Sequence, residues 1–109
     1  MAKIEILNTS ILTVFGSYNY EPVSLEDAQE MVSSNPEGFE SAVGHQSTAE
    51  ILTTLLEVEV PVNRVFFVQE VGQTALVFKL RGRAPEGIIL SREEVEAIGY
   101  DFGRLTRLS

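Results

Sequence analysis

A single histidine offers the clearest chemistry in this chain of 109 residues. His45 lies within the segment SAVGHQSTAE, residues 41–50, where a strand is expected to end and a helix to begin. An imidazole exchanges a proton close to neutral pH and can act as a general acid or base. The free N–H groups and dipole of a helix start attract an anion, and Gly44 lets the backbone approach one closely. The spacing predicts an acid beside a phosphate; the alternative is a structural histidine at the end of a strand.

Charge is distributed unevenly along the sequence, which has a net charge of −8. Residues 1–63 contain one basic residue and ten acids, whereas residues 64–109 contain seven basic residues and six acids. This asymmetry favours a local positive site for a compact anion, with ordinary surface arginines as the alternative interpretation. Binding to duplex DNA needs many phosphate contacts over a broad basic face, so we do not expect it.

Several common chemistries are absent from the sequence. It contains no cysteine, which excludes disulfides, thiolate nucleophiles and cysteine-based zinc sites. It also contains no H-E-x-x-H segment, no glycine-rich phosphate-binding loop and no G-x-S-x-G turn. Because no dense acidic cluster suggests Mg²⁺ either, we expect neither a metal nor a cofactor.

Length and hydrophobicity predict one domain over residues 1–109, since 44% of the residues are hydrophobic. The sequence shows neither a secretory signal nor an apolar run long enough to span a membrane. We therefore expect a cytoplasmic protein, in the host cytoplasm if the chain is viral, with no membrane partner.

Three serines mark the expected helix starts. Ser24 precedes two acids, and Ser47 and Ser91 each precede a glutamate three residues later, which is the capping-box pattern. The helix after Ser47 carries an apolar face made by Ile51, Leu52, Leu55 and Leu56. The three helices are expected to end at the turn of residues 35–38, before Pro61 and at Gly99.

Strands are expected at residues 3–7, 39–43, 64–69, 74–80 and 102–108, with a short extended or helical piece at 11–15. Residues 64–69 and 74–80 flank a glycine-containing turn and predict an antiparallel hairpin. Strands and helices alternate without a strict parallel pattern. The predicted fold is α+β or α/β, a mixed sheet of about five strands with helices packed on it.

Four segments resemble those of a known family in order and spacing: ILNTSIL, VGHQSTAEIL, PVNRVFF and ALVFKLRGRAPEGIILSREEVEAIGYDFG. Together they resemble the viral type III anti-CRISPR ring nucleases and their cellular CRISPR-associated relatives. The resemblance covers nearly the whole chain, and its most specific parts are the G-H-x-S-T element and the R-x-P-E-G loop.

The resemblance implies a small homodimer that binds cyclic tetra-adenylate, the second messenger of type III CRISPR systems. It implies cleavage without a metal to linear di-adenylates with a 2′,3′-cyclic phosphate end, which switches the signal off. The alternatives are a non-catalytic protein that sequesters cyclic oligoadenylates and, with less support from the acidic charge, a nucleic-acid-binding regulator.

The same resemblance assigns roles to individual residues. His45 would protonate the leaving 5′ oxygen, and Arg83 would stabilise charge on the phosphorane. Glu86 would orient Arg83 or bind a ribose hydroxyl. The implied ligand-binding residues are Asn8, Ser10, Ser47, Arg64 and Lys79.

Overall fold

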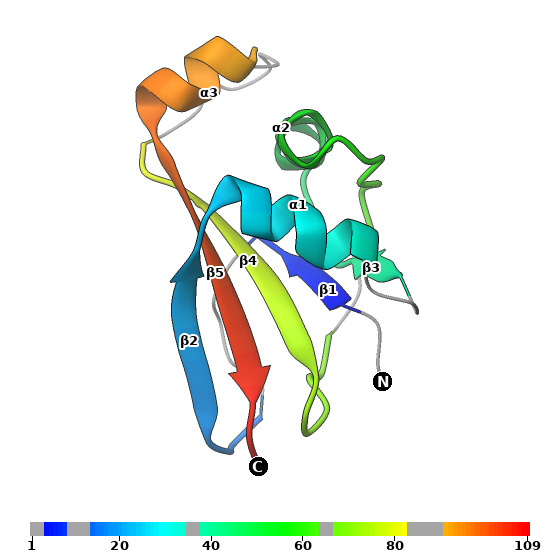
Figure 1. The fold of residues 1–109 in the computed structure, drawn as a ribbon. Helices are drawn as coiled ribbons and strands as arrows, with labels where there is room; N and C mark the ends of the chain where they lie inside the picture. The colour runs from blue at the N-terminus through cyan, green and yellow to red at the C-terminus, as the bar shows by residue number, and fades with distance from the viewer. Residues whose placement is uncertain (1–3, 9–13, 35–37, 64–66, 83–90) are drawn as a thin grey trace.

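The computed structural model describes residues 4–8, 14–34, 38–63, 67–82 and 91–109 (Figure 1). The described elements are, in chain order, β1 (Ile4–Leu7), β2 (Tyr18–Val23), α1 (Leu25–Ser34), β3 (Phe39–Ser41), α2 (Gln46–Leu56), β4 (Thr74–Leu80), α3 (Arg92–Ile98) and β5 (Tyr100–Arg107). They confirm the predicted α+β fold with a mixed sheet and packed helices.

The described strands form a five-stranded sheet in the order β2-β5-β4-β1-β3. Strand β1 pairs in parallel with β3 on one side and with β4 on the other. Strand β5 runs antiparallel to both β4 and β2. The carboxyl ends of β1, β3 and β4 consequently lie at the same edge of the sheet.

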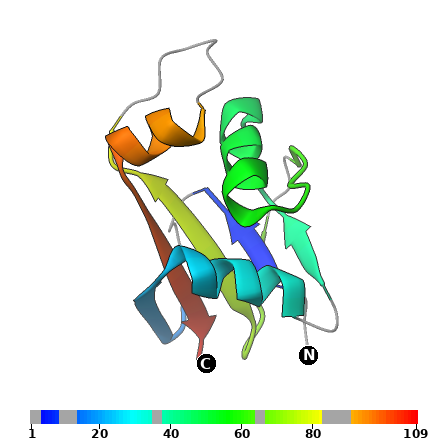
Figure 2. The same cartoon turned by 45° about the horizontal axis from the view of Figure 1, so that its top comes forward.

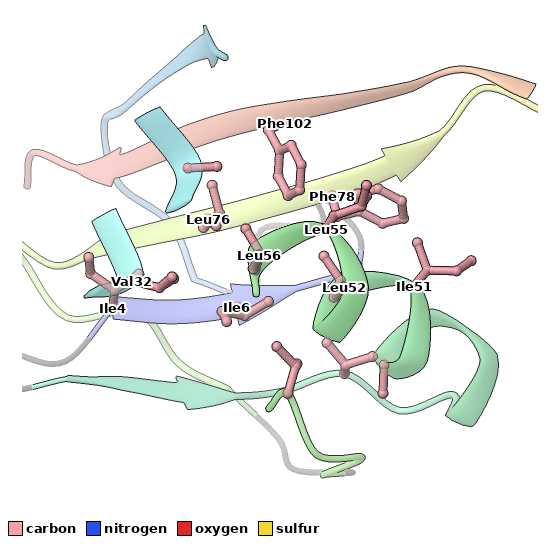
Figure 3. Packing of buried hydrophobic residues seen from close by; sticks show 14 of the residues in the cluster. Ile4, Ile6, Val32, Ile51, Leu52, Leu55, Leu56, Leu76, Phe78 and Phe102 are labelled. Carbon is pink, nitrogen blue, oxygen red and sulfur yellow. The ribbon is translucent and has the colours of Figure 1, made fainter. Parts of the chain in front are cut away.

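Of the described helices, α1 and α2 cover one face of the sheet, and α3 lies beside α2 at the end of β4 and β5, as the two views in Figures 1 and 2 show. Ile6 and Leu76 from the sheet and Leu52 and Leu55 from α2 are fully buried between these layers (Figure 3). The predicted apolar face of α2 is confirmed, since its four residues are all buried. The other face of the sheet buries a smaller cluster: Leu7, Ala75, Val77 and Leu105.

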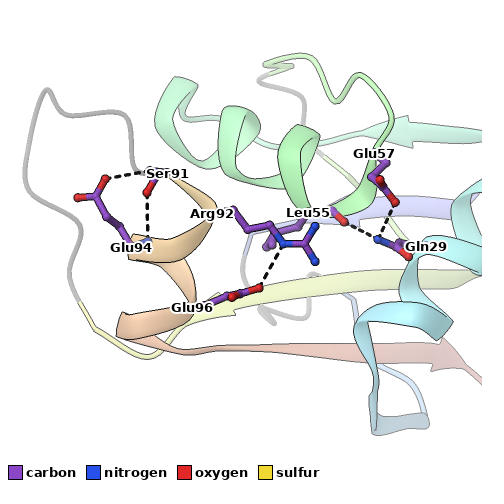
Figure 4. Close-up of polar contacts among 7 residues, drawn as sticks. All are labelled: Gln29, Leu55, Glu57, Ser91, Arg92, Glu94 and Glu96. Atoms are coloured by element: carbon purple, nitrogen blue, oxygen red, sulfur yellow. Dashed lines mark hydrogen bonds and ion pairs between the residues drawn. The ribbon is translucent and has the colours of Figure 1, made fainter.

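Two of the three predicted helix starts are confirmed. The Ser24 hydroxyl accepts a hydrogen bond from the N–H of Asp27 at 3.1 Å. Ser91 and Glu94 form the predicted capping box (Figure 4). Gly99 ends α3 with φ of +89°. Such serine caps satisfy N–H groups that the helix itself leaves unpaired.

The predicted capping box at Ser47 is wrong. Helix α2 begins at Gln46, with His45 as its N-cap residue. The carbonyl of His45 accepts the first helical hydrogen bond, from Ala49 N–H at 3.0 Å, so Ser47 already lies inside the first turn. Glu50 bonds to the side chain of Gln46 at 3.1 Å instead.

The predicted hairpin of residues 64–69 with 74–80 is also wrong. The two sides of β4 are occupied by β1 and β5, and the described residues 67–70 form no strand. The turn itself is present, since Gly72 has φ of +85° and the N–H of Gln73 donates to the carbonyl of Glu70 at 3.0 Å.

Strand β2 was not predicted. It lies at the edge of the sheet, where three of its six residues are exposed and the other three are partly exposed. Pro22 is tolerated because one side of the strand has no partner. The piece expected at residues 11–15 falls largely outside the described residues. Within the described ranges, no helix has the length and apolar character needed to cross a membrane.

Replacing Leu52 tests whether α2 is held to the sheet by apolar burial. Leu52→Ala removes a fully buried side chain from the centre of the core and should lower the free energy of unfolding by about 2–5 kcal/mol. Thr54→Ala, at an exposed position of the same helix, is the control and should change it by less than about 0.5 kcal/mol. Urea unfolding measures both, and equal losses would contradict the packing described.

Candidate functional site

The carboxyl edge of the parallel strands gathers several of the predicted site residues. Asn8 directly follows β1, His45 lies between β3 and α2, and Lys79 is near the end of β4. Ligands of open sheets with parallel strands commonly bind beyond the carboxyl ends of those strands. This edge is therefore the candidate site.

His45 presents its imidazole to solvent at this edge. Its backbone is extended, with φ of −127° and ψ of 132°, and its side chain does not cap the helix. The residue is exposed, and no described residue hydrogen-bonds to the ring. Because the first-turn N–H groups of α2 also have no side-chain cap, an anion at this point would meet both an imidazole and unpaired N–H donors.

A buried polar network fixes the chain just before His45. The Ser41 hydroxyl donates to the carbonyl of Pro61 at 2.6 Å and accepts from the N–H of Val43 at 3.2 Å. Asn63 donates through its side chain to the carbonyl of Ser41 at 2.7 Å and through its N–H to that of Val43 at 2.8 Å. These bonds hold Asn63, the residue before Arg64, against the end of β3 and the residues that lead from it to His45.

The other predicted site residues are distributed as follows. Asn8 is half-buried at the end of β1, and Ser47 is exposed in the first turn of α2, close to His45. Lys79 is exposed on the sheet face opposite the helices, because its neighbours Phe78 and Leu80 pack toward them. Four predicted residues lie outside the described ranges: Ser10, Arg64, Arg83 and Glu86.

Arg81, one of the basic residues of the segment 64–109, is paired with an acid. Its guanidinium donates two hydrogen bonds to the carboxylate of Asp101, at 3.1 and 2.6 Å. This hydrogen bonding, together with the charge of Arg81, holds the pKa of Asp101 below its ordinary value. The same hydrogen bonding, together with the negative charge of Asp101, raises the pKa of Arg81. Lys79, which is opposite Asp101 in the strand register, lowers the pKa of Asp101 further.

Three residues that form hydrogen bonds near the candidate site were not predicted from the sequence. Ser41 and Asn63 anchor the chain before His45, and Asp101 holds Arg81 at the end of β4. A serine at the end of a short strand and an asparagine two residues after a proline are weak signals for such pairing. Within the described ranges, no group of three or more histidine or acidic side chains is placed to hold a metal ion.

A model of the STIV B116-like family matches residues 4–102 of the sequence. The chain belongs to this family. Its relatives include the uncharacterized protein YddF of Bacillus subtilis (strain 168), 33% identical over 97% of this chain and 98% of that protein. The uncharacterized protein ORF117 of Acidianus two-tailed virus is 36% identical over 94% of this chain and 92% of its own.

A further relative is the uncharacterized protein 26 of Sulfolobus islandicus filamentous virus, 37% identical over 89% of this chain and 85% of its own. Among solved structures, B116 of Sulfolobus turreted icosahedral virus matches with a TM-score of 0.84. That match covers 97% of this chain and all of B116 at 22% identity, so it supports the fold alone.

Replacing Ser41 tests the network before His45. Ser41→Ala leaves the carbonyl of Pro61 and the N–H of Val43 without the serine hydroxyl in a buried site and should lower the free energy of unfolding by about 1–3 kcal/mol. Ser33→Ala, which removes an exposed hydroxyl bonded within α1, should cost less than about 0.5 kcal/mol. Chemical denaturation that finds the two variants equally stable would contradict the network.

The pair of Arg81 and Asp101 should appear in the acid stability of the protein. Because folding lowers the pKa of Asp101, the stabilisation is present above the ordinary Asp value of about 3.9 and is lost as pH falls through the lower, folded pKa. Because both side chains are about 60% exposed, the effect is small: Asp101→Asn should have a slightly lower melting temperature than the wild type at pH 7, and the difference should shrink below about pH 4. A melting-temperature difference that is constant from pH 7 to pH 3 would be inconsistent with this ion pair.

Proposed function

We propose that this chain is a metal-independent ring nuclease that binds cyclic tetra-adenylate and cleaves it to linear di-adenylates. The observation that carries the proposal is the exposed His45 at the start of α2, in a chain of the STIV B116-like family. The sequence segments around His45 and from residue 75 onward, which resemble the ring nucleases, give the proposal its substrate. By this activity the protein switches off type III CRISPR signalling in the cytoplasm.

The chemistry needs no external nucleophile. The 2′-hydroxyl of one adenylate attacks the adjacent phosphorus, the new O2′–P bond replaces the P–O5′ bond, and one proton passes overall from O2′ to O5′. Each cleavage is thus an internal transesterification that consumes no water and leaves a 2′,3′-cyclic phosphate. Two cleavages of the ring release two di-adenylates.

The proposed catalytic roles follow from this reaction. His45 donates the proton to the departing O5′, since it is the one imidazole in the sequence. Arg83 and Arg64 bind the phosphate oxygens, because a planar guanidinium can make two parallel hydrogen bonds to them. Glu86 orients Arg83 or binds a ribose hydroxyl.

The remaining proposed contacts bind the ligand. Asn8 and Ser47 lie at the same edge of the sheet as His45 and are suited to polar contacts with ribose or phosphate. Ser10 belongs to the same proposed set. Lys79 is the least supported member, because its side chain is directed to the opposite face of the sheet.

The proposal includes a homodimer. A ring of four identical nucleotides has repeating symmetry, and a two-fold dimer offers it two identical half-sites. Each half-site would then contribute one His45 to one of the two cleavages.

Replacing His45 tests the enzyme directly. In the presence of a chelator, the wild type should convert cyclic tetra-adenylate to di-adenylates that carry a 2′,3′-cyclic phosphate, identified by mass spectrometry. His45→Ala should cut about 10²- to 10⁴-fold more slowly, because the leaving oxygen has no general acid. Thr54→Ala, an exposed position near the other end of α2, should cut at the wild-type rate.

The outcomes separate the candidate functions. Full activity in His45→Ala would refute its role as the acid. A wild-type protein that binds the ring and releases it uncut would favour sequestration instead. A salt-sensitive shift of duplex DNA in a gel would favour a nucleic-acid-binding regulator.

A further inference from the structure

The end of the β4–β5 ladder is held by backbone and side-chain bonds together. The last registered pair joins Leu80 to Tyr100, and the N–H of Arg81 then donates to the carbonyl of Gly99 at 2.9 Å. The guanidinium of Arg81, which follows the last ladder pair, donates hydrogen bonds to both carboxylate oxygens of Asp101. Two parallel bonds fix the orientation of a guanidinium more strictly than one does.

Two close approaches reinforce this end of the sheet. A Cβ added to Gly99 would lie 3.1 Å from Cδ of Arg81, and the φ of Gly99, +89°, disfavours any other residue. A Cβ added to Gly82 would lie 3.0 Å from Cγ2 of Ile98. The chain that leaves β4 is therefore packed tightly against the end of α3.

Helix α3 is itself fixed to the rest of the molecule. Its first turn is closed by the capping box of Ser91 and Glu94 (Figure 4), and Val95 is 1% exposed within the core under the helices. The chain is thus anchored at Gly82 and again at Ser91. Arg83 is the next residue after the first of these anchors.

We propose that Asp101 is a positioning residue that acts through Arg81 to set the direction in which the chain leaves β4 toward Arg83. The inference rests on the proposed function, which gives Arg83 its contact with the phosphate. Asp101 touches no ligand in this account. It contributes by holding the residue two positions before the phosphate-binding arginine in one orientation.

Because the side chains of Arg81 and Asp101 are exposed, a positioning role can be distinguished from a contribution to stability. The side chains of Arg81 and Asp101 are 60% and 59% exposed, and ion pairs in such positions contribute little to global stability. The geometry of a bound phosphate is far more sensitive, since small misplacements of a catalytic contact can slow a reaction by up to about 100-fold. Loss of the pair should consequently affect the reaction more than the fold.

The chain offers a matched control. Arg104 on β5 pairs with Glu21 on β2, and these side chains are 44% and 41% exposed. This pair joins β5 to β2, and it is not adjacent to the segment that carries Arg83. Glu21→Gln removes an ion pair of the same type from the same sheet.

The experiment measures single-turnover cleavage of cyclic tetra-adenylate by the full chain at saturating protein. Asp101→Asn should lower the cleavage rate about 10-fold, while Glu21→Gln keeps the wild-type rate and the two variants show similar melting temperatures. Arg81→Lys keeps the charge but cannot form the two parallel bonds, so it should match Asp101→Asn. Wild-type rates in Asp101→Asn or in Arg81→Lys would overturn the inference.

The same substitution in an Arg83→Ala variant tests whether Asp101 acts on the cleavage rate through Arg83. Arg83→Ala already removes the contact that Asp101 is proposed to position, so adding Asp101→Asn should cause no further loss of rate. An additional 10-fold loss in the double variant would show that Asp101 acts by another route and would overturn the proposal.

An amide-exchange experiment without ligand tests this inference separately from the proposed function. In the free protein, Asp101→Asn should speed amide exchange of Arg81, whose N–H bonds to Gly99, and Glu21→Gln should not. If the wild type fails to cut the ring, the proposed function fails, and faster exchange at Arg81 still supports the anchoring role. Unchanged exchange at Arg81 in Asp101→Asn would overturn it.

Discussion

The parallel pairing of β1 with strands on both of its sides is the constraint on which the rest of the structure depends. It requires the chain to return from the carboxyl end of β3 before it can enter β4 in the same direction. Helix α2 spans part of that return, and its buried face packs over β1 through Leu52 and Leu55 against Ile6 and Leu76. The start of α2 is therefore placed at the carboxyl edge, and His45 is placed there with it.

Polar contacts then fix the chain near both ends of α2. Asn63 and Ser41 tie the strand before His45 to the chain that leads into Arg64, and Gln29 of α1 donates to the carbonyl of Leu55 near the other end of α2 at 2.8 Å (Figure 4). The helix is thus secured near both ends while its first-turn N–H groups have no side-chain cap. A helix start that is fixed by hydrogen bonds from behind and exposed to solvent at His45 is consistent with the proposed binding of an anion there.

Local signals in the sequence predicted the helices well, because the apolar spacing around Leu52 and the cap at Ser91 act within a few residues. The hairpin was wrong because Val- and Phe-rich segments show the tendency to form strands but not which strands pair. Strand β2 was not predicted because an edge strand buries too little to show a clear alternation. Of the site, the position of His45 at a helix start was predictable, whereas the pairing of Asp101 with Arg81 depends on strand register, which the sequence does not display.

The central claim is that His45 faces a bound phosphodiester at the carboxyl edge of the sheet. The sequence contains one histidine, so a single set of imidazole resonances reports on this position by NMR. Titration with a 2′-O-methylated cyclic tetra-adenylate, which cannot be cut, should shift those resonances saturably together with the amides of Asn8 and Ser47. Imidazole resonances that stay unmoved while the ring binds elsewhere on the protein, or that stay unmoved because it does not bind, would contradict the account.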